Sequence, residues 1–310
     1  YLAEAIRQAG CAALLMDVGT HHLSPVQADL PASSVAAAAG EDINQMRALP
    51  RGEAVSKMSR AASLYLGQMA TANQLDGVVG LGGSGGTTIC AAAMRALPYG
   101  LPKLLVSTLA SGNTQWHIDI SDIVMMPSIL DIGGLNPMLC MVLNNAAQAI
   151  SGMAKGYRPF TPSGKTVVSF TMYGTTTPGV SRAKDEVERA GFEPWVFHAS
   201  GVGGRTMEKF ISLGYIHAVA DMTLAEVGAH IVGGLHDAGP DRLEAAGEHG
   251  LPQVIVPGAA DTVVLPPRDQ IPDRFRHRVL NFHNPTMTTM RTTPEENVAI
   301  ANFIADKLNR

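Results

Sequence analysis

The hydrophobic positions of this chain fall into short apolar runs separated by longer amphipathic segments, and this pattern runs through both halves. Apolar runs predict strands at 12–17, 77–81, 103–107, 122–126, 167–172, 195–198, 217–221 and 253–256. Apolar residues spaced three or four apart predict helices at the start of the chain and at 53–73, 87–97, 136–153, 179–190, 206–213, 224–232 and 241–249. Strands that alternate with helices predict parallel sheets covered by helices.

One segment interrupts this alternation and is the best candidate for a linker. The stretch KGYRPFTPSGK, from Lys155 to Lys165, contains two prolines and two glycines and has little apolar periodicity. A chain of 310 residues also exceeds the usual single domain of about 100–200 residues. We therefore expect an α/β protein with two Rossmann-like domains, residues 1–157 and 158–310, each with a mainly parallel sheet flanked by helices.

Two segments have the spacing of a helix capping box. Thr293-Pro-Glu-Glu296 combines a capping threonine, a proline at the first helical position and a glutamate three residues after the cap. It predicts a final helix that ends near Leu308. Thr223 and Glu226 have the same spacing, so we expect Glu226 to act as a structural cap.

Charge and composition exclude several classes of function. The formal net charge is −4 and no run of lysine or arginine is present, so we expect no direct binding of nucleic acid. The three cysteines lie far apart, which is typical of free thiols in a reducing compartment. No uninterrupted apolar run reaches 18 residues, so we expect no membrane span and a cytoplasmic protein.

The turns that follow the predicted strands are rich in glycine, serine and threonine. In parallel sheets these turns lie at the carboxyl edge, where ligands bind. They read GLGGSGGTT (80–88), STLASGNT (107–114), YGTTTPG (173–179), HASGVGGRT (198–206) and PGAADT (257–262). Backbone N–H groups and hydroxyls in such turns can hold a phosphate. The alternative is that the glycines let a strand and a helix pack closely.

The stretch from Gly80 to Thr88 partly matches two nucleotide-binding motifs. Gly80, Gly82 and Gly85 satisfy G-x-G-x-x-G, but no carboxylate follows about 20 residues later, which argues against a nicotinamide cofactor. Gly86 stands where a P-loop has its lysine, which argues against an ordinary P-loop NTPase. We expect phosphate contacts from Gly82, Gly83, Ser84, Gly85, Gly86, Thr87, Thr88, Ser111, Gly112, Thr175, Thr176, Ser200, Gly201, Gly203, Gly204 and Arg205.

Two residues are candidates for catalysis. His198 ends a predicted strand and can act as an acid or base, or be a histidine satisfied within the fold. Asp261 can coordinate Mg²⁺, accept from a ribose hydroxyl, or cap a helix. His21 and His22 are expected in a surface loop, and His283-Asn-Pro285 in a structured turn. Because no compact His/Cys spacing occurs, we expect no metal site formed by these residue types.

Long ordered blocks of the sequence carry a resemblance to a known family. These blocks include the run from GLGGSGGTT to STLASGN, then TMYGTTTPGV, VFHASGVGGRTME, IVGGLHDAGPDRLEAAG, PQVIVPGAAD and HNPTMTTMRTTPEEN. Together they resemble the family of the tomato mosaic virus resistance protein, a group of ATP-binding proteins, over nearly the whole chain. Asn113 departs from the aspartate expected of that family.

The resemblance implies two Rossmann-like domains, a homodimer and bound ATP. Mg²⁺ is the ion that we expect to accompany ATP. The resemblance also implies that residues before Tyr1 and after Arg310 are missing. The expected partner is therefore a nucleotide or another phosphorylated small molecule. The alternative function is a metabolic enzyme that acts on a phosphorylated or carboxylated substrate with Mg-ATP, with His198, Arg205 or Asp261 as working groups.

Overall fold

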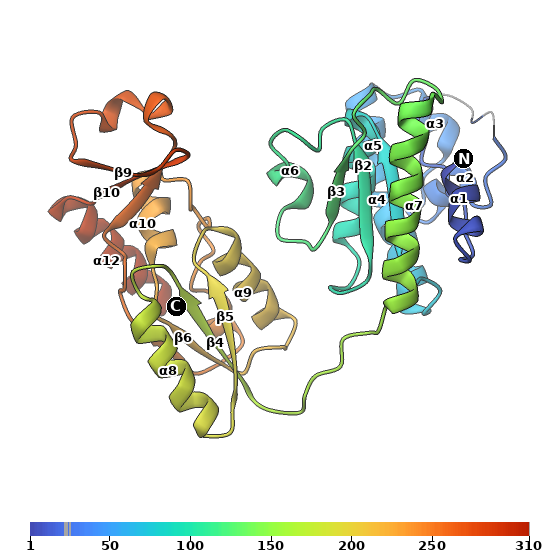
Figure 1. The fold of residues 1–310 in the computed structure, drawn as a ribbon. Helices are drawn as coiled ribbons and strands as arrows, with labels where there is room; N and C mark the ends of the chain where they lie inside the picture. Colours follow the sequence, from blue (N-terminus) through green and yellow to red (C-terminus); the bar gives the residue numbers. More distant parts are fainter. Residues whose placement is uncertain (22–23, 25, 310) are drawn as a thin grey trace. The chain divides into compact units, whose positions relative to one another are not determined.

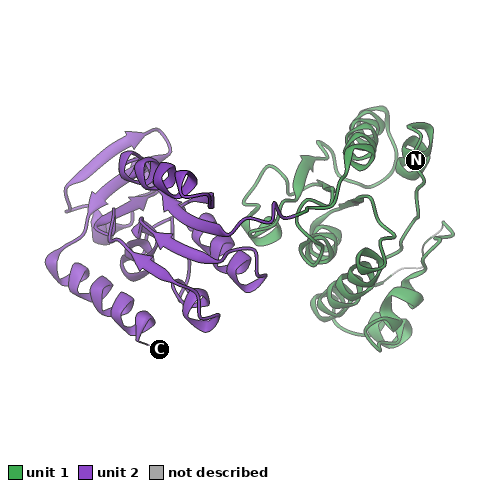
Figure 2. Ribbon diagram, turned by 90° about the horizontal axis from the view of Figure 1, so that it is seen from below, with its two compact units in different colours: residues 1–161 green, residues 162–310 purple. Residues whose placement is uncertain are grey.

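The computed structural model describes residues 1–21, 24 and 26–309, and the chain forms two compact units, Tyr1–Thr161 and Pro162–Arg310 (Figure 2). Each unit contains a parallel sheet flanked by helices. The expected α/β class with two Rossmann-like domains is therefore confirmed. Within the described residues, no helix is both long enough and apolar enough to cross a membrane.

The first unit is built around a three-stranded parallel sheet in the order β1-β2-β3 (Figure 1). Its elements are α1 (Leu2–Gln8), α2 (Ala32–Ala37), α3 (Ile43–Arg47), α4 (Arg51–Thr71), β1 (Val78–Gly82), α5 (Ser84–Arg95), β2 (Lys103–Ser107), α6 (Gln115–Ile118), β3 (Val124–Pro127) and α7 (Pro137–Gly156). Successive side chains of β2 point to opposite faces. Leu104 and Val106 pack against α1 and α7, whereas Leu105 packs against α5. Helix α4 in turn packs against α5.

All five residues of β2 are buried, which suits the central strand of a sheet covered on both faces. Its first residue is a lysine, whose charge must be compensated in this position. The Lys103 ammonium donates to the carbonyls of Pro98 at 2.7 Å and Leu101 at 3.0 Å, and to Asp122 Oδ1 at 2.6 Å. These three acceptors use all the protons of the ammonium, so the lysine is fully satisfied.

The second unit combines a parallel sheet, in the order β5-β4-β6-β7, with a smaller antiparallel sheet, in the order β8-β10-β9. Its elements are β4 (Val167–Met172), α8 (Thr177–Arg189), β5 (Glu193–His198), α9 (Val202–Ser212), β6 (Ala218–Asp221), α10 (Ala225–Val232), α11 (Ala245–Glu248), β7 (Gln253–Ile255), β8 (Thr262–Leu265), the 3₁₀ turns Arg268–Gln270 and Asp273–Phe275, β9 (Leu280–Asn284), β10 (Met287–Arg291) and α12 (Pro294–Leu308). The capping box at the start of α12 is confirmed, because Thr293 and Glu296 each accept the other's backbone N–H.

The antiparallel sheet was not among the predicted strands. Strand β9 is largely exposed, so it lacks the apolar run that marks a buried strand. Strand β10 buries Thr288 and Met290 on one face, an alternation that its three polar residues obscure in the sequence. His283 and Asn284 end strand β9, and the hairpin turns at Pro285 and Thr286, so of the structured turn expected at 283–285 only Pro285 lies in the turn.

The strand predicted at 12–17 is wrong. In this segment Met16 forms an isolated parallel bridge with Leu30, and no ladder extends from it. Leu14 and Leu15 are 63% and 38% exposed, whereas Ala13 and Met16 are half-buried and pack at the margins of two hydrophobic clusters. An apolar run becomes a buried strand when neighbouring strands pair with it along its length, and this run has a single bridge instead. The helix predicted at 87–97 begins at Ser84, so the glycine-rich stretch contributes to both β1 and α5.

We predict that Gly82→Ala destabilises the first unit, because a Cβ at Gly82 would lie 2.7 Å from the Gly86 Cα. Overpacking of this kind costs about 1–3 kcal/mol. Urea unfolding followed by circular dichroism measures the change. Gly67→Ala on α4 is the control, since a Cβ there meets nothing within 4 Å and alanine favours the helix by up to about 1 kcal/mol. Equal stabilities of the two variants would contradict the packing argument.

Candidate functional site

In the stretch that joins β1 to α5, close packing explains two glycines, Gly80 and Gly82. A Cβ at Gly80 would lie 2.8 Å from the Cβ of Cys90, and one at Gly82 would crowd the helix backbone. Both glycines therefore let α5 pack closely on β1. The same contact buries the Cys90 thiol, and this burial raises its pKa to about 11. The packing explanation for glycine thus holds at these two positions.

Gly83 and Gly85 have no such packing reason. The nearest atom to a Cβ at Gly83 would be Thr108 Oγ1 at 3.9 Å, and a Cβ at Gly85 would meet Arg51 Nη2 at 3.6 Å. Both are ordinary contact distances. In the described part of the chain no side chain caps α5, and the N–H groups of residues 84–86 have no acceptor. Three amides at the positive end of a helix therefore remain open.

The two threonines of the stretch have their hydroxyls engaged within the protein. Thr87 is fully buried, and its Oγ1 donates to the Gly82 carbonyl at 3.1 Å and lies 2.6 Å from Ser107 Oγ. Thr88 Oγ1 donates to the Ser84 carbonyl at 2.9 Å. Of the stretch from Gly82 to Thr88, the part open to a ligand is the first turn of the helix, from Gly83 to Gly86.

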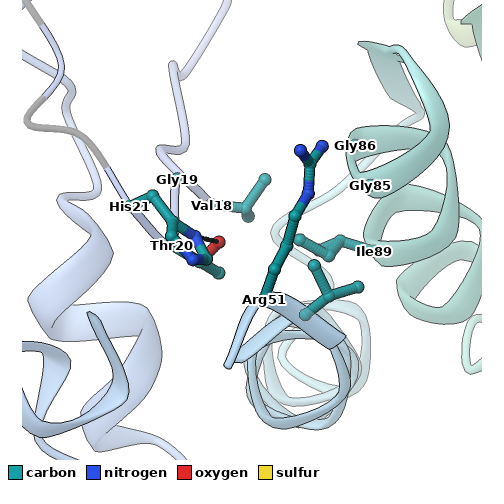
Figure 3. A pocket seen from close by; sticks show the side chains of 9 residues that line it. Val18, Gly19, Thr20, His21, Arg51, Gly85, Gly86 and Ile89 are labelled. Atoms are coloured by element: carbon teal, nitrogen blue, oxygen red, sulfur yellow. Dashed lines mark hydrogen bonds between the residues drawn. The ribbon is translucent and has the colours of Figure 1, made fainter. Parts of the chain in front are cut away.

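A cavity of about 390 Å³ lies beside this turn (Figure 3). We call it the first cavity, and its lining residues are Val18, Gly19, Thr20, His21, Arg51, Val55, Gly85, Gly86 and Ile89. Arg51 is the first residue of α4, and its exposed side chain points toward Gly86 (Figure 3). Within the described chain, no hydrogen bond or ion pair engages its guanidinium. The cavity therefore combines two helix N-termini with a positive charge, an arrangement that attracts anions.

Arg51 is not among the predicted site residues, because those residues lie in turns that follow strands, whereas this arginine begins a helix that follows a coil. The position of Pro50 directly before Arg51 marks a helix start and could have pointed to it. His21 lies in the expected exposed loop, yet it also lines the first cavity, with its Nδ1 2.8 Å from Thr20 Oγ1. His22 lies outside the described residues.

A second cavity of about 360 Å³ lies at the carboxyl ends of β2 and β3. Its lining residues are Ser107, Thr108, Ser111, Pro127, Ser128, Ile129, Leu130 and Asp131. The predicted residue Ser111 is among them. Gly112 belongs to the same turn, and its N–H donates to the Leu109 carbonyl at 3.2 Å. Unlike the first cavity, this one is lined by hydroxyls and a carboxylate.

The corresponding turn of the second unit, between β5 and α9, holds an anion that the protein itself supplies. The N–H groups of Gly201 and Gly204 donate to Glu226 Oε1 at 2.6 and 2.9 Å, and Glu226 is fully buried. Glu226 has a structural role, as expected, but it does not cap its own helix, because no side chain caps α10 and the carboxylate reaches the neighbouring turn instead. Spacing along the sequence cannot reveal such a partner.

Packing explains all three glycines of this turn. Gly201 has φ +88°, and a Cβ at Gly203 would overlap the His198 carbonyl. A Cβ at Gly204 would overlap Glu226 and Arg242. Ser200 Oγ donates to the His198 carbonyl at 3.4 Å, and Arg205 lies in the first turn of α9. The turns at Gly83 and Gly201 therefore look alike in sequence, but the second is filled by an internal carboxylate.

Comparison with known proteins gives a family for both halves of the chain. The N-terminal domain of the Uncharacterised protein family UPF0261 matches residues 1–159, and the C-terminal domain of that family matches residues 165–310. The chain belongs to the UPF0261 family.

Relatives from bacteria and a plant align over most of the chain. A UPF0261 protein of Clostridium tetani is 42% identical over 311 residues, which cover 100% of this chain and 77% of the relative. One from Rhizobium meliloti is 42% identical over 310 residues, which cover 100% of this chain and 76% of the relative. The ToMV resistance protein Tm-1(GCR237) of Solanum lycopersicum is 42% identical over 265 residues, 84% of this chain and 35% of the tomato protein. The resemblance to the tomato protein is thereby confirmed.

In this UPF0261 chain, Glu226 belongs to a buried network centred on Arg242. The guanidinium lies 2.6 Å from Asp221 Oδ2, 3.0 Å from Glu226 Oε2 and 2.9 Å from Glu208 Oε1. Burial alone would lower the pKa of Arg242, but the three carboxylates raise it well above its ordinary value. The arginine is therefore permanently charged, and it fixes the ends of β6, α9 and α10 relative to one another.

Glu208 is the outer member of this network. Its Oε1 accepts from Leu243 N at 2.7 Å, and its Oε2 accepts from Ala245 N at 3.0 Å. Burial raises the pKa of Glu208, and the charge of Asp221 adds to this effect, whereas Arg242 and the two amides oppose it. One arginine does not compensate three carboxylates, so the network gains stability when Glu208 binds a proton.

A second cluster of titratable groups lies at the carboxyl edge of the parallel sheet of the second unit. Tyr173 follows β4, and its ring stacks on His198 at 5.6 Å and meets His236 edge-on at 5.8 Å. Burial lowers the pKa of His236, and the neighbouring His198 lowers it further. Burial also raises the pKa of Tyr173. The cluster thus places a neutral imidazole beside a protonated phenol at neutral pH.

The remaining predicted residues of the second unit make contacts within the protein. Thr176 Oγ1 lies 2.7 Å from Thr223 Oγ1, and the adjacent Thr175 is exposed. Asp261 forms an ion pair with Arg291 of β10. Among the described residues, no group of three or more His, Cys, Asp or Glu side chains is arranged to hold a metal ion.

We predict that Glu208→Gln removes a pH dependence from the stability of the second unit. The raised pKa means that the folded wild-type protein binds a proton more tightly than the unfolded chain, whose glutamate has a pKa of about 4.3. The stabilisation from this proton is complete below that value and is lost as the pH rises through the folded pKa. The free energy of unfolding of the wild type, minus that of the variant, should therefore fall as the pH rises from about 4.3 through the folded pKa of Glu208.

Urea titrations at several pH values measure this difference through the fluorescence of Trp195 on β5. The change Trp116→Phe removes the signal of the other tryptophan, which lies in the first unit and is 76% exposed. A difference that stays constant with pH, or that rises through this window, would contradict the assignment to Glu208.

Proposed function

We propose that this chain binds the phosphate groups of a nucleotide, ATP in the first instance, against the first turn of α5 in the first cavity. The observation that carries the proposal is the set of three open amides at residues 84–86 beside the unpaired guanidinium of Arg51 in the described chain. Amides at a helix N-terminus and an arginine are the groups that hold phosphate oxygens in proteins.

Gly83 and Gly85 support this proposal, because packing within the protein does not require a glycine at either position. Gly85 borders both the cavity and Arg51, and the fold has room for a methyl group there. A glycine at such a position lets a ligand approach the backbone closely. The choice of ATP and of a homodimeric state rests on the resemblance to the family of the tomato resistance protein. Mg²⁺ is proposed as the ion that accompanies ATP, and a cytoplasmic location is proposed from the free cysteines and from the short apolar runs.

We predict that Arg51→Gln weakens the binding of Mg-ATP, because it removes a charge-assisted contact to phosphate. Such contacts contribute about 1.5–3 kcal/mol, which corresponds to a loss of roughly tenfold to a hundredfold in affinity. Isothermal titration calorimetry measures the change. Arg60→Gln, an exposed arginine on the same helix, is the matched control and should bind as wild type does.

A second variant separates binding from stability. Gly85→Ala leaves the N–H in place and fits the fold, so its unfolding midpoint should be equal to or higher than that of wild type. Its methyl group would occupy the space in which the phosphate lies, so its affinity for Mg-ATP should fall. Wild-type affinity in both Arg51→Gln and Gly85→Ala would remove this turn from the binding site.

A second candidate function is a metabolic enzyme that acts on a phosphorylated or carboxylated molecule with Mg-ATP. The cluster of Tyr173, His198 and His236 favours it, because a neutral imidazole beside a phenol can transfer protons at neutral pH. In this proposal His198 is the exposed acid or base. Asp261 is the weaker candidate, because Arg291 already compensates its charge.

If this second proposal holds, purified protein should consume Mg-ATP in the presence of its substrate, and His198→Gln should reduce the rate without weakening ATP binding. Release of ADP or phosphate during incubation with a panel of small carboxylic acids and sugars measures turnover. His277→Gln, which changes a histidine outside the cluster, is the control. No turnover with any member of the panel would count against the enzyme and leave the binding function.

A further inference from the structure

The second cavity carries a different chemistry from the first. Its described lining contains the carboxylate of Asp131 and four hydroxyl groups, and it contains no cationic side chain. A phosphate would meet repulsion from the carboxylate there without compensation. A ligand group with several hydroxyl donors would instead satisfy both the carboxylate and the hydroxyls.

Two of the hydroxyls are already committed to the fold. Ser107 Oγ bonds to Thr87 and accepts from Leu109 N at 2.9 Å, and Ser128 Oγ donates to the Leu130 carbonyl at 2.6 Å. Both serines are buried. These bonds fix the two segments that form the walls of the cavity, the one after β2 and the one after β3.

The other polar groups are open. Within the described chain, Thr108 Oγ1, Ser111 Oγ and Asp131 Oδ2 make no hydrogen bond, and all three residues are exposed. Asp131 Oδ1 accepts from Ile132 N at 2.8 Å, which holds the carboxylate in place and leaves its second oxygen for a ligand. Ile129 has φ +66°, a strained conformation for a β-branched residue, in the same segment.

The turn that begins α5 touches both cavities. A Cβ at Gly83 would face Thr108 Oγ1 of the second cavity at 3.9 Å, and a Cβ at Gly85 would face Arg51 of the first at 3.6 Å. The open amides of Ser84 and Gly85 lie between these two contacts along the turn, and that of Gly86 follows directly. One ligand can therefore place an anion on the amides and extend a neutral part toward Thr108 and Asp131.

We propose that the second cavity binds the sugar part of a phosphorylated sugar or nucleotide, with Asp131 accepting hydrogen bonds from vicinal hydroxyls and Thr108 and Ser111 completing the contact. This inference rests on the proposed function, because the phosphate of the same ligand lies on the first turn of α5. It adds a specificity site for hydroxyl groups, which a binding site for inorganic anions would lack.

Calorimetry with two probes tests the inference, namely inorganic phosphate and ribose 5-phosphate, both in EDTA so that no divalent cation bridges Asp131 to the anion. Wild-type protein should bind ribose 5-phosphate at least about tenfold more tightly than phosphate, since hydrogen bonds to a charged group contribute this much or more. Asp131→Asn should abolish this preference and leave the affinity for phosphate unchanged or slightly higher. Thr108→Val should reduce the preference in the same direction.

The matched control is Asp76→Asn, which removes an exposed carboxylate before β1, at the opposite edge of the same sheet. It should keep the preference for ribose 5-phosphate. Equal binding of the two probes by wild type, or equal weakening of both by Asp131→Asn, would overturn the inference and leave the phosphate site intact. The proposed function itself would be overturned by two other outcomes. The wild-type protein would bind neither probe, or the Arg51→Gln variant would bind both probes with the affinity of the wild type.

Discussion

The N–H groups at the start of a helix that faces a sheet edge need an acceptor, and the two units meet this need in different ways. In the second unit the carboxylate of Glu226 accepts from Gly201 and Gly204 at the start of α9. In the first unit, within the described residues, the amides of residues 84–86 have no partner from the protein. A buried charge satisfies one turn, whereas the other depends on solvent or a ligand.

The internal acceptor of the second unit depends on further interactions. A buried glutamate is stabilised by an opposite charge beside it, and Glu226 shares the single positive charge of Arg242 with Asp221 and Glu208. The glycines of this turn are then required, because any side chain at Gly204 would displace the pair. The glycine-rich sequence of this turn is therefore a consequence of the buried charge network.

Much of the fold could be predicted from the sequence, because burial on both faces leaves a clear pattern. The apolar runs that became β2 and β4 begin and end at the predicted residues, 103–107 and 167–172. The run at 12–17 has the same local pattern and is only partly buried, since burial depends on neighbours that a local pattern does not contain. Strands β9 and β10 were missed because they contain polar or exposed residues, whereas β8 buries Val263, Val264 and Leu265 and was missed although its pattern is that of a short buried strand.

The position of the candidate site in the first unit could be predicted from the sequence, whereas the groups that line it could not. The glycine-rich stretch led to the first turn of α5, but sequence alone did not separate Gly82, which packs against α5, from Gly85, which borders a cavity. Arg51 and Asp131 escaped notice because each belongs to a segment distant in sequence from the turn. The interaction of Glu226 with Gly201 also joins residues 25 positions apart, a distance at which capping rules carry no information.

The internal carboxylate of the second unit has a consequence for how the molecule can respond to its surroundings. An acceptor carried on the same chain is present at a fixed effective concentration, and no solute at ordinary concentration displaces it. The turn at Gly201 is thus permanently saturated and insensitive to metabolite levels. Under the proposed function, the occupancy of the turn at Gly83 would follow the concentration of its anion, so any sensing of such a solute by these two turns would belong to the N-terminal half.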